Sequence, residues 1–329
     1  MGLYRSVVKP LSFALPPEIS HCSALWCLRL PLPWSLIGGA VEDPGLETDL
    51  AGIRLRNPVG LASGFDKDCR RLAALGKLGF GYLVGGTLTR RPRAGNPRPR
   101  LVRLAKQRSA VNSMGLPNAG VEAAAAHLAL LRKTAPVLVS LADEEGADVS
   151  SGFELLRSHI DGFELNVSCP NVSWGRDCDN EAHLRSILSA LAPLREKPLF
   201  VKLPPFGTDA EREAVLALAR IAVEAGASGL TCSNSRPIEE PRLAGGSGGL
   251  SGAVLADATP RIVSEVRRAV EGVVPINACG GVGGAEDARR CLEAGATTVQ
   301  LYTALVYEGP RLLREITTGL ASAAPAARD

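Results

Sequence analysis

The segment ELNVSCPN, residues 164–171, contains the residues best suited to acid–base chemistry. A short apolar run ends there in polar side chains, among them Asn166, Cys169 and Asn171. A thiol titrates near pH 8.5, and lower beside cations or helix N-termini, so Cys169 is the candidate catalytic base. By composition alone, a cysteine is more often a buried structural residue than a catalytic one. Its position at the end of a strand, between two asparagines, favours the catalytic interpretation.

Further amides and hydroxyls follow other apolar runs. The segment NSMGLPN, residues 112–118, is typical of a ligand clamp with free backbone N–H groups. Asn234 lies between Ser233 and Ser235 after another run. Asparagine both donates and accepts hydrogen bonds, so amides from separate loops suit a planar ring that carries carbonyl and N–H groups.

Two lysines are placed where an anionic ligand would need them. Lys67 follows the first apolar run, and Lys202 lies inside the fifth, between Val201 and Leu203. A buried lysine without an anion is costly. The alternative partner for Lys202 is a core carboxylate, but few acids fall on the predicted strands. The pattern therefore favours a cofactor.

Turns that can expose backbone N–H groups precede two predicted helices. CGGVGG, residues 279–284, follows the seventh apolar run, and Tyr302-Thr303 follows the eighth. GGLSG, residues 248–252, adds a third donor-rich loop. Backbone N–H groups in such turns hold phosphate in α/β barrels, although glycines can also serve only to let strands turn tightly.

Short apolar runs alternate with longer amphipathic segments from Asn57 onward, which predicts eight buried parallel strands and their helices. The predicted strands are Val59–Ala62, Tyr82–Gly85, Val137–Leu141, Gly162–Val167, Leu199–Leu203, Gly229–Cys232, Ile276–Cys279 and Thr298–Leu301. The predicted helices include Asp68–Leu78, Glu181–Leu194, Asp209–Glu224, Thr259–Val270 and Ala285–Ala294. This order predicts an α/β protein with a (β/α)8 TIM-type barrel, whose site lies at the carboxyl ends of the strands. An open doubly wound sheet is the alternative, but the first turn lacks a GxGxxG spacing.

Residues 1–45 differ from the barrel, which we assign to residues 46–329. They predict two short helices, Tyr4–Phe13 and Pro17–Leu30, followed by apolar residues among prolines. One interpretation is a helical lid over the bottom of the barrel. The other is an interfacial helix pair that enters the lipid headgroup layer. No run is long enough to span a bilayer or to form a secretory signal core.

The composition argues against several classes of protein. The formal charge of +3 over 329 residues is too slight to indicate nucleic-acid binding by itself. The arginine-dense stretch from Arg90 to Arg108 lacks interleaved aromatics, so a solvated or self-associating loop is favoured over a nucleic-acid surface. The 8 cysteines form no CxxC pair, which indicates neither a zinc knuckle nor an iron–sulfur cluster and favours a reducing compartment.

Taken together, these motifs resemble the dihydroorotate dehydrogenases. The segments that carry the resemblance are NPVGLASGFDKD (57–68), GNPRPRLVRL (95–104), NSMGLPNAG (112–120), ELNVSCPN (164–171), VKLPP (201–205), SNS (233–235), GGLSG (248–252), CGGVGG (279–284) and VQLYTALVYEGP (299–310).

The resemblance implies oxidation of (S)-dihydroorotate to orotate in pyrimidine biosynthesis. Cys169 would take the proton from C5 of the substrate while C6 gives a hydride to FMN. The implied cofactor residues are Ser63, Gly64, Lys67, Thr87, Ser140, Asn166, Lys202, Ser233, Gly252, Gly280, Gly281, Tyr302 and Thr303. The implied substrate residues are Lys67, Asn112, Met114, Gly115, Leu116, Asn166, Asn171, Asn234 and Ser235.

The resemblance is mixed with respect to the electron acceptor. The N-terminal helices, the GFDK loop and the LYTALVYEGP segment are similar to the membrane-associated class that uses quinone. The NSMGLPN clamp, the cysteine in SCPN and VKLPP are similar to the soluble class, which uses fumarate or, with a partner subunit, NAD. Residues 1–45 favour a quinone. We therefore expect a cytoplasmic protein that can lie on the inner face of the cell membrane.

Three other activities remain as alternatives. A dihydropyrimidine-type dehydrogenase shares ELNxSCP but would be expected with cluster-binding cysteines. A dihydrouridine synthase would need an RNA-binding domain. A silent FMN-binding barrel would not need the base and the amides.

Overall fold

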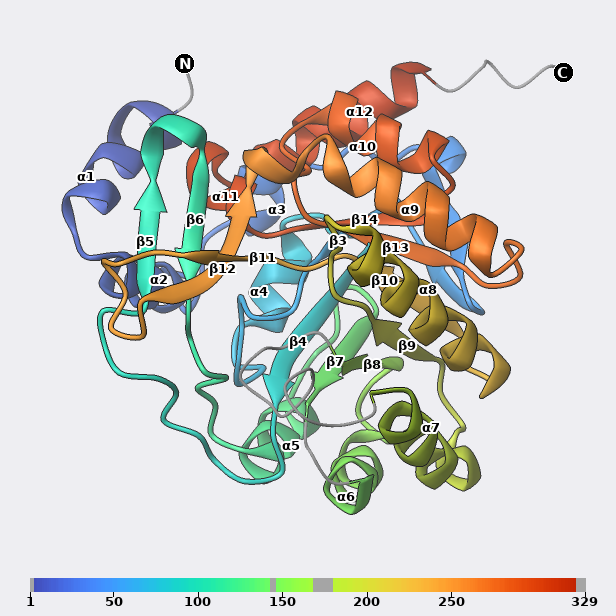
Figure 1. Ribbon diagram of the computed structural model, residues 1–329. Helices are drawn as coiled ribbons and strands as arrows, with labels where there is room; N and C mark the ends of the chain where they lie inside the picture. Colours follow the sequence, from blue (N-terminus) through green and yellow to red (C-terminus); the bar gives the residue numbers. More distant parts are fainter. Residues whose placement is uncertain (1–2, 143–145, 168–179, 324–329) are drawn as a thin grey trace, which may run out of the picture.

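A closed barrel of eight parallel strands forms the centre of the molecule (Figure 1). The computed structural model describes residues 3–142, 146–167 and 180–323. The barrel order is β10-β13-β14-β3-β4-β7-β8-β9. The strands are β3 (Val59–Leu61), β4 (Tyr82–Leu88), β7 (Val137–Leu141), β8 (Gly162–Asn166), β9 (Leu199–Lys202), β10 (Gly229–Cys232), β13 (Ile276–Cys279) and β14 (Thr298–Leu301). The predicted TIM-type barrel is therefore confirmed, with each strand in its predicted place.

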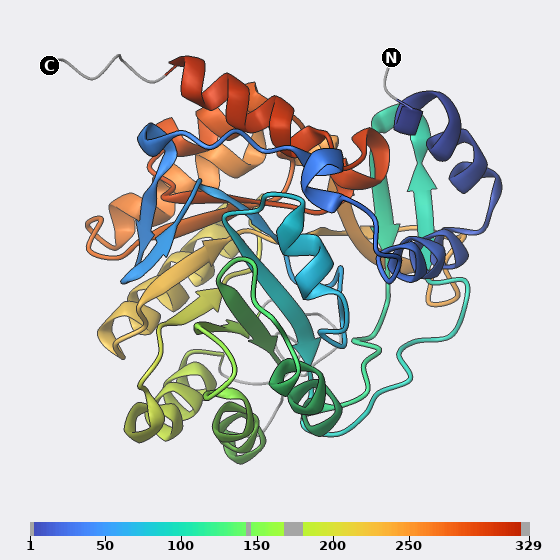
Figure 2. The same cartoon turned by 180° about the vertical axis from the view of Figure 1, so that it is seen from behind.

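Helices surround the barrel and bury the outer faces of its strands (Figures 1 and 2). They are α4 (Leu72–Lys77), α5 (Val121–Ala129), α6 (Gly146–Leu156), α7 (Asn180–Leu191), α8 (Asp209–Glu224), α9 (Ala258–Ala269), α10 (Ala285–Glu293), α11 (Thr303–Glu308) and α12 (Leu312–Ala323). Short helical turns occur at Pro44–Leu46, Ala105–Gln107, Ala192–Leu194 and Ala253–Leu255. Helix α8 has the predicted bounds because Thr208 and Glu211 form a capping box at its start.

Helix α4 starts later than predicted, at Leu72 instead of Asp68. The Asp66 carboxylate accepts the backbone N–H groups of Arg70 and Arg71 at 3.0 and 2.6 Å. Cys69, which lies between Asp66 and Arg70 in the chain, has a φ of 57°. These features hold residues 66–71 in a turn, so the helix can begin only after it.

A hairpin closes the amino-terminal end of the barrel. Its strands are β1 (Thr48–Leu50) and β2 (Ile53–Leu55). Leu50 and Leu55 pack against Tyr82 and Phe200 from the barrel interior. This packing fills the barrel interior at its amino-terminal end, which leaves the carboxyl end for the site.

A second sheet stands beside the carboxyl end of the barrel (Figure 1). It is antiparallel, in the order β11 (Arg236–Glu239), β12 (Ser247–Gly252), β6 (Ser109–Asn112) and β5 (Leu101–Leu104). We expected loops over 90–108 and 248–252, and both expectations were wrong in part. Backbone pairing makes this sheet, so its glycines, serines and arginines carry little strand signal.

The N-terminal segment forms a π-helical turn at Tyr4–Val8, then α1 (Lys9–Ala14), α2 (Pro17–Cys27) and α3 (Trp34–Gly38). The lid interpretation placed these helices at the bottom of the barrel, which is wrong. Helices α1 and α2 lie beside β5 and β6, which follow the carboxyl end of β4 (Figures 1 and 2).

Two arginines, one just before β5 and one within it, hold α1 and α2 in this position. Arg100 donates to Glu18 at 3.0 Å, and Arg103 donates to the carbonyl of Leu15 at 3.1 Å. Arg100 is only 7% exposed. The solvated-loop interpretation of the arginine stretch is therefore wrong here.

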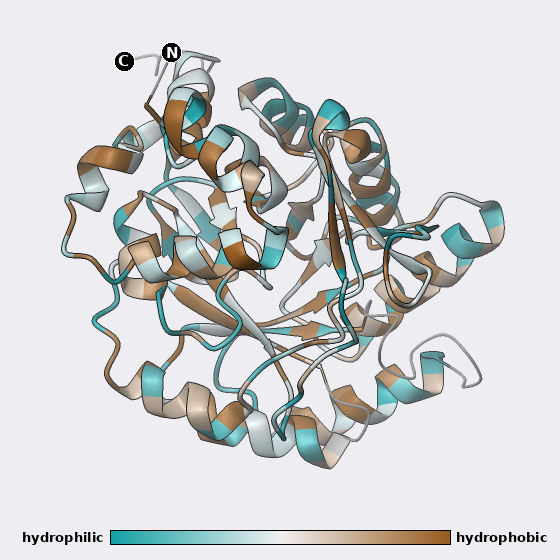
Figure 3. Ribbon diagram, turned by 90° about the vertical axis from the view of Figure 1, so that its left-hand side faces the viewer, coloured by the Kyte–Doolittle hydropathy of each residue, from teal (hydrophilic) through white to brown (hydrophobic). Residues whose placement is uncertain are grey.

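Large apolar side chains remain exposed on α1, α2 and α3. They include Leu11, Ile19, Trp26 and Leu36. The ribbon of these helices includes many hydrophobic residues (Figure 3). Within the described ranges, no helix is long and apolar enough to cross a membrane.

Candidate functional site

Lys202 lies inside the carboxyl half of the barrel and is 3% exposed. Its Nζ donates to Ser63 Oγ at 3.3 Å and lies 3.8 Å from Glu164 Oε1. A cofactor was favoured over a core carboxylate as the partner of this lysine, but the structure supplies the carboxylate, because Glu164 points inward from β8. Sequence reasoning missed Glu164 because strands buried on both faces do not reveal which residues point inward.

A cluster of an amide and two hydroxyls caps three neighbouring strands. Thr87 Oγ1 is 3.0 Å from Ser140 Oγ and accepts from Asn166 Nδ2 at 3.3 Å. All three residues are buried, and they belong to β4, β7 and β8. These side chains were predicted from separate segments, and the barrel brings them together.

The two glycine-rich turns and the Tyr302-Thr303 turn also meet. A Cβ on Gly281 would lie 2.4 Å from the backbone nitrogen of Ala256, in the turn after β12. Thr303 Oγ1 donates to Ser251 Oγ at 3.0 Å, which joins the start of α11 to the end of β12. Gly280 and Gly252 have φ values of 118° and 100°, which L-residues rarely adopt. Glycine is therefore required for these turns to approach one another.

The clamp segment joins the SNS segment through the second sheet. Asn112 Nδ2 donates to the carbonyl of Gly249 at 3.4 Å, and a Cβ on Gly249 would lie 2.1 Å from Ser235 Oγ. Asn234 Oδ1 accepts the Ser235 N–H at 2.8 Å. The structure thus places Asn112, Asn234 and Ser235 in one group.

The rest of the clamp folds back on the loop before β5. The carbonyl of Met114 accepts from Asn96 N at 3.0 Å. A Cβ on Gly115 would lie 2.4 Å from Asn96 Oδ1. Leu116 packs against the main core. Gly115 and Leu116 both have positive φ, of 71° and 53°, so the loop is tightly turned.

Lys67 and Tyr302 converge on the loop after β3. Lys67 Nζ donates to the carbonyl of Gly64 at 2.8 Å, and Tyr302 OH donates to the same oxygen at 3.3 Å. Burial, and next the charge of Arg100, lower the pKa of Lys67. Ser233 is buried at the end of β10, where its N–H donates to the carbonyl of Cys279 at 3.0 Å.

Aromatic rings connect this group to α2. The rings of His21 and Phe65 are 5.3 Å apart, and those of Phe65 and Tyr302 are 5.4 Å apart, both edge-on. Burial, and next the charge of Lys67, lower the pKa of His21 to about 4. Sequence reasoning missed His21. The available signal was a histidine in an otherwise apolar helix that follows Glu18.

Two predicted site residues, Cys169 and Asn171, lie outside the described residues. The assignments of base and substrate ligand to them stay predictions.

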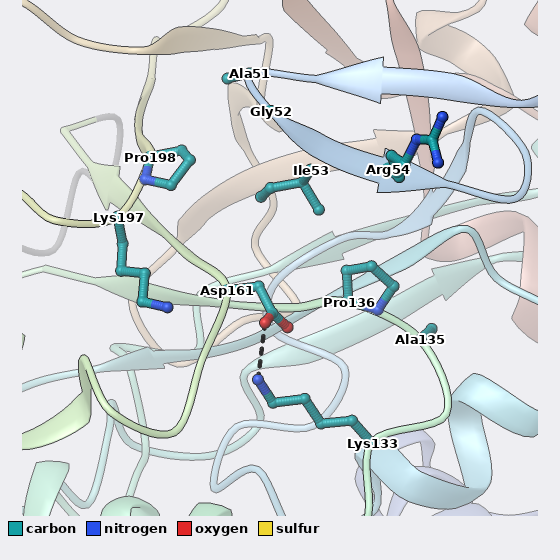
Figure 4. Close-up of a pocket in the computed structure, with 10 residues that line it drawn as sticks. All are labelled: Ala51, Gly52, Ile53, Arg54, Lys133, Ala135, Pro136, Asp161, Lys197 and Pro198. Carbon is teal, nitrogen blue, oxygen red and sulfur yellow. Dashed lines mark hydrogen bonds and ion pairs between the residues drawn. The ribbon is translucent and has the colours of Figure 1, made fainter.

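A hollow of about 600 Å³ opens at the opposite end of the barrel (Figure 4). It is lined by the β1–β2 turn, Lys133, Asp161 and Lys197, and Lys133 pairs with Asp161 at 2.9 Å. None of the predicted site residues lines it. Because functional sites in such barrels lie at the carboxyl end, this hollow is not the candidate site.

The residues at the carboxyl end fit a flavin. The glycine turns form a close-packed cradle suited to a phosphate, and Lys202 with the Thr87 cluster suits a ring with carbonyl and N–H groups. Gln300 adds a further buried amide on β14, 2% exposed. The fold and this set of side chains together define a flavin-type (β/α)8 barrel.

Comparisons with known proteins agree with this class. The family model described as dihydroorotate dehydrogenase matches residues 45–323, and the chain belongs to this family. A dihydroorotate dehydrogenase (quinone) from Sphingopyxis alaskensis is 37% identical, over 98% of this chain and 93% of the relative. Another from Salinispora arenicola is 38% identical, over 95% and 97%.

Solved structures give the same result. The crystal structure of Eimeria tenella DHODH in complex with ferulenol has a TM-score of 0.82 and 30% identity, and covers 92% of this chain and 90% of that one. The ligand-free Eimeria tenella structure has a TM-score of 0.80. The prediction of a flavin-dependent dihydroorotate dehydrogenase is therefore confirmed.

Proposed function

We propose that this chain binds FMN, oxidises (S)-dihydroorotate to orotate in pyrimidine biosynthesis, and passes the electrons to a quinone. One observation carries the proposal. Lys202, the Thr87–Ser140–Asn166 cluster and the glycine turns occupy one end of the barrel, beside a clamp rich in amides.

FMN would be held by residues from separate loops. The phosphate would lie on Gly252, Gly280, Gly281, Tyr302 and Thr303. The flavin and ribityl chain would lie along Ser63, Gly64, Lys67, Thr87, Ser140, Asn166, Lys202 and Ser233. When bound, FMN accepts two electrons from the substrate, and this redox chemistry belongs to the cofactor.

The protein would orient the pyrimidine and remove a proton. We assign the pyrimidine contacts to Lys67, Asn112, Met114, Gly115, Leu116, Asn166, Asn171, Asn234 and Ser235. Cys169 would take the proton from C5, as a base positioned by its strand end. Lys67 would balance the carboxylate charge of the substrate.

The acceptor would approach through residues 1–45. The ring series His21, Phe65 and Tyr302 gives an apolar path from α2 to the loop after β3. The low pKa of His21 keeps this ring neutral near pH 7, which suits an uncharged quinone. The exposed apolar side chains of α1–α3 would rest on the membrane surface, where quinones are dissolved.

Parallel turnover tests this proposal. The purified enzyme is given dihydroorotate with ubiquinone, menaquinone, fumarate and NAD in separate reactions. We expect rapid turnover with a quinone only. Brisk turnover with fumarate and none with quinones would leave dihydroorotate oxidation standing and refute the acceptor.

A further inference from the structure

Glu164 is a carboxylate in the barrel interior that the assigned functions leave unused. It is 1% exposed, and its Oε1 lies 3.8 Å from Lys202 Nζ. Taking a carboxylate out of water costs several kcal/mol unless other groups compensate its charge. Its hydrogen-bond partners therefore indicate how its charge is compensated and what the residue does.

One side of Glu164 ends a chain of hydrogen bonds that crosses the barrel. Tyr82 OH lies 2.8 Å from Thr298 Oγ1, which donates to Asn277 Oδ1 at 2.6 Å. Asn277 Nδ2 donates to Thr231 Oγ1 at 3.3 Å. Thr231 Oγ1 in turn donates to Glu164 Oε2 at 3.0 Å. Because Thr298 and Thr231 each donate onward, the chain points its hydrogens toward Glu164.

The other side of Glu164 ends a second, shorter chain. Lys202 Nζ donates to Ser63 Oγ at 3.3 Å, and Ser63 Oγ donates to Glu164 Oε1 at 3.0 Å. Both carboxylate oxygens are thus acceptors. This is the hydrogen-bond pattern that an ionised carboxylate makes.

The thiol of Cys279 also faces Lys202 from β13. Burial raises the pKa of Cys279, so the thiol is neutral and does not balance the lysine charge. Glu164 is the carboxylate that the structure pairs with Lys202.

We propose that Glu164 is a positioning residue that acts through Lys202 and lowers the reduction potential of the flavin. The proposal rests on the proposed function, in which Lys202 faces FMN. Reduction adds negative charge to a flavin, and a nearby ammonium stabilises it. An ionised Glu164 offsets part of that ammonium charge, so the reduced cofactor is less stabilised. Electrons then pass more readily to the acceptor.

Glu164→Gln tests this directly, because it keeps the shape and removes the charge. We measure the midpoint potential of FMN bound to the full-length enzyme by redox titration. The ratio of reduced to oxidised flavin should rise about tenfold at a given potential, which is about 30 mV for a two-electron couple. The control is Glu224→Gln at the exposed end of α8, paired there with Arg185, which should leave the potential unchanged.

A double-variant cycle tests whether Glu164 acts through Lys202. In a Lys202→Met background the carboxylate has no ammonium to offset. Glu164→Gln should then change the potential little. An equal shift in both backgrounds would refute the role as a positioning residue.

A second variant, Thr231→Val, tests the same inference if Glu164→Gln does not fold. Thr231→Val keeps the shape and removes the hydroxyl that donates to Oε2. The carboxylate then has one hydrogen-bond donor fewer and offsets more of the Lys202 charge. The reduction potential of the flavin should therefore drop. An unchanged or raised potential in this variant, or an unchanged one in Glu164→Gln, contradicts the inference. A wild-type protein that binds no flavin contradicts the proposed function instead, so the two failures are distinguishable.

Discussion

The side chains of the site depend on one another at the scale of single residues. Lys202 is buried beside Glu164, and Ser63 bridges the two by hydrogen bonds. Thr87 likewise links Ser140 to Asn166. Because each buried polar group is compensated by a neighbour, changing one member should affect chemistry or stability in a way that identifies its role.

Removing the proposed base should slow chemistry without removing the cofactor. Cys169→Ala should slow flavin reduction by dihydroorotate by roughly 10²–10⁴-fold, the usual contribution of a general base. Rapid mixing without oxygen measures this rate, and orotate binding should persist. Cys22→Ala, at an exposed thiol on α2, is the control and should reduce normally. A near-normal rate in Cys169→Ala would mean that another residue removes the proton from the substrate.

His21 should make stability depend on pH. Its folded pKa is about 4, below the ordinary 6.5, so the unfolded chain binds a proton first as pH falls. This contribution to stability is complete above pH 6.5 and is lost progressively between 6.5 and about 4, by at most about 1.4 kcal/mol per pH unit. Urea unfolding of wild type and His21→Phe over this range measures the difference.

The pH dependence of His21→Phe should be shallower than that of wild type. His159→Phe serves as the control, because this residue lies outside the N-terminal helices. Parallel curves for wild type and His21→Phe would mean that the ring is not buried in solution.

Single elements also depend on buried charges. Arg100 connects α2 to the loop before β5, because it contacts Glu18 at 2.9 Å and the carbonyls of Ala94 and Asn96 at 2.9 and 3.1 Å. Arg100→Ala removes the donor to both carbonyls and one of the two arginines that pair with Glu18, and should lower the free energy of unfolding by about 1.5–3 kcal/mol.

Arg98 provides a matched control, because it pairs with the same Glu18 at 2.8 Å but its side chain is 71% exposed. Arg98→Ala should cost at most about 1 kcal/mol. Chemical unfolding measures both variants. Equal losses would contradict the role assigned to the buried arginine.

The barrel strands could be predicted from sequence, and the second sheet could not. Each barrel strand is a short apolar run, as Val137–Leu141 shows, and such runs are typical of strands buried on both faces. Strands β11 and β12 contain Arg236, Glu239 and several glycines, and are mostly exposed or half-buried. Their pairing depends on backbone hydrogen bonds between distant segments, which leave no local pattern.

The site could be predicted in part, for a similar reason. Thr87, Ser140 and Asn166 were predicted from the family resemblance, and they lie near the carboxyl ends of neighbouring strands, where the barrel rule places a site. Glu164 could not be placed, because its inward direction follows from the register of β8 against β9. His21 reaches the site through the packing of α2, which depends on Arg100 and not on any local motif.

At the scale of the whole molecule, the exposed apolar side chains of the N-terminal helices predict membrane binding. Trp26 is 59% and Leu30 38% exposed. Replacing both with Glu should sharply weaken sedimentation with liposomes and turnover with membrane-embedded quinone. Reduction of the flavin by dihydroorotate should not change, because the proposed contacts with FMN and orotate lie outside residues 1–45.

Leu130→Glu is the matched control for this surface, because Leu130 is 84% exposed at the end of α5. It should bind liposomes as wild type does. If both variants bind equally well, residues 1–45 do not make the membrane contact.

The most direct test of the central claim is an anaerobic titration of the purified chain with dihydroorotate, followed by the visible absorption of the flavin. Our account predicts one FMN per chain, complete bleaching by about one equivalent of dihydroorotate, and orotate as the product. Adding a quinone should restore the colour. A colourless protein that fails to bind added FMN, or a bound flavin that dihydroorotate does not bleach, would contradict the account.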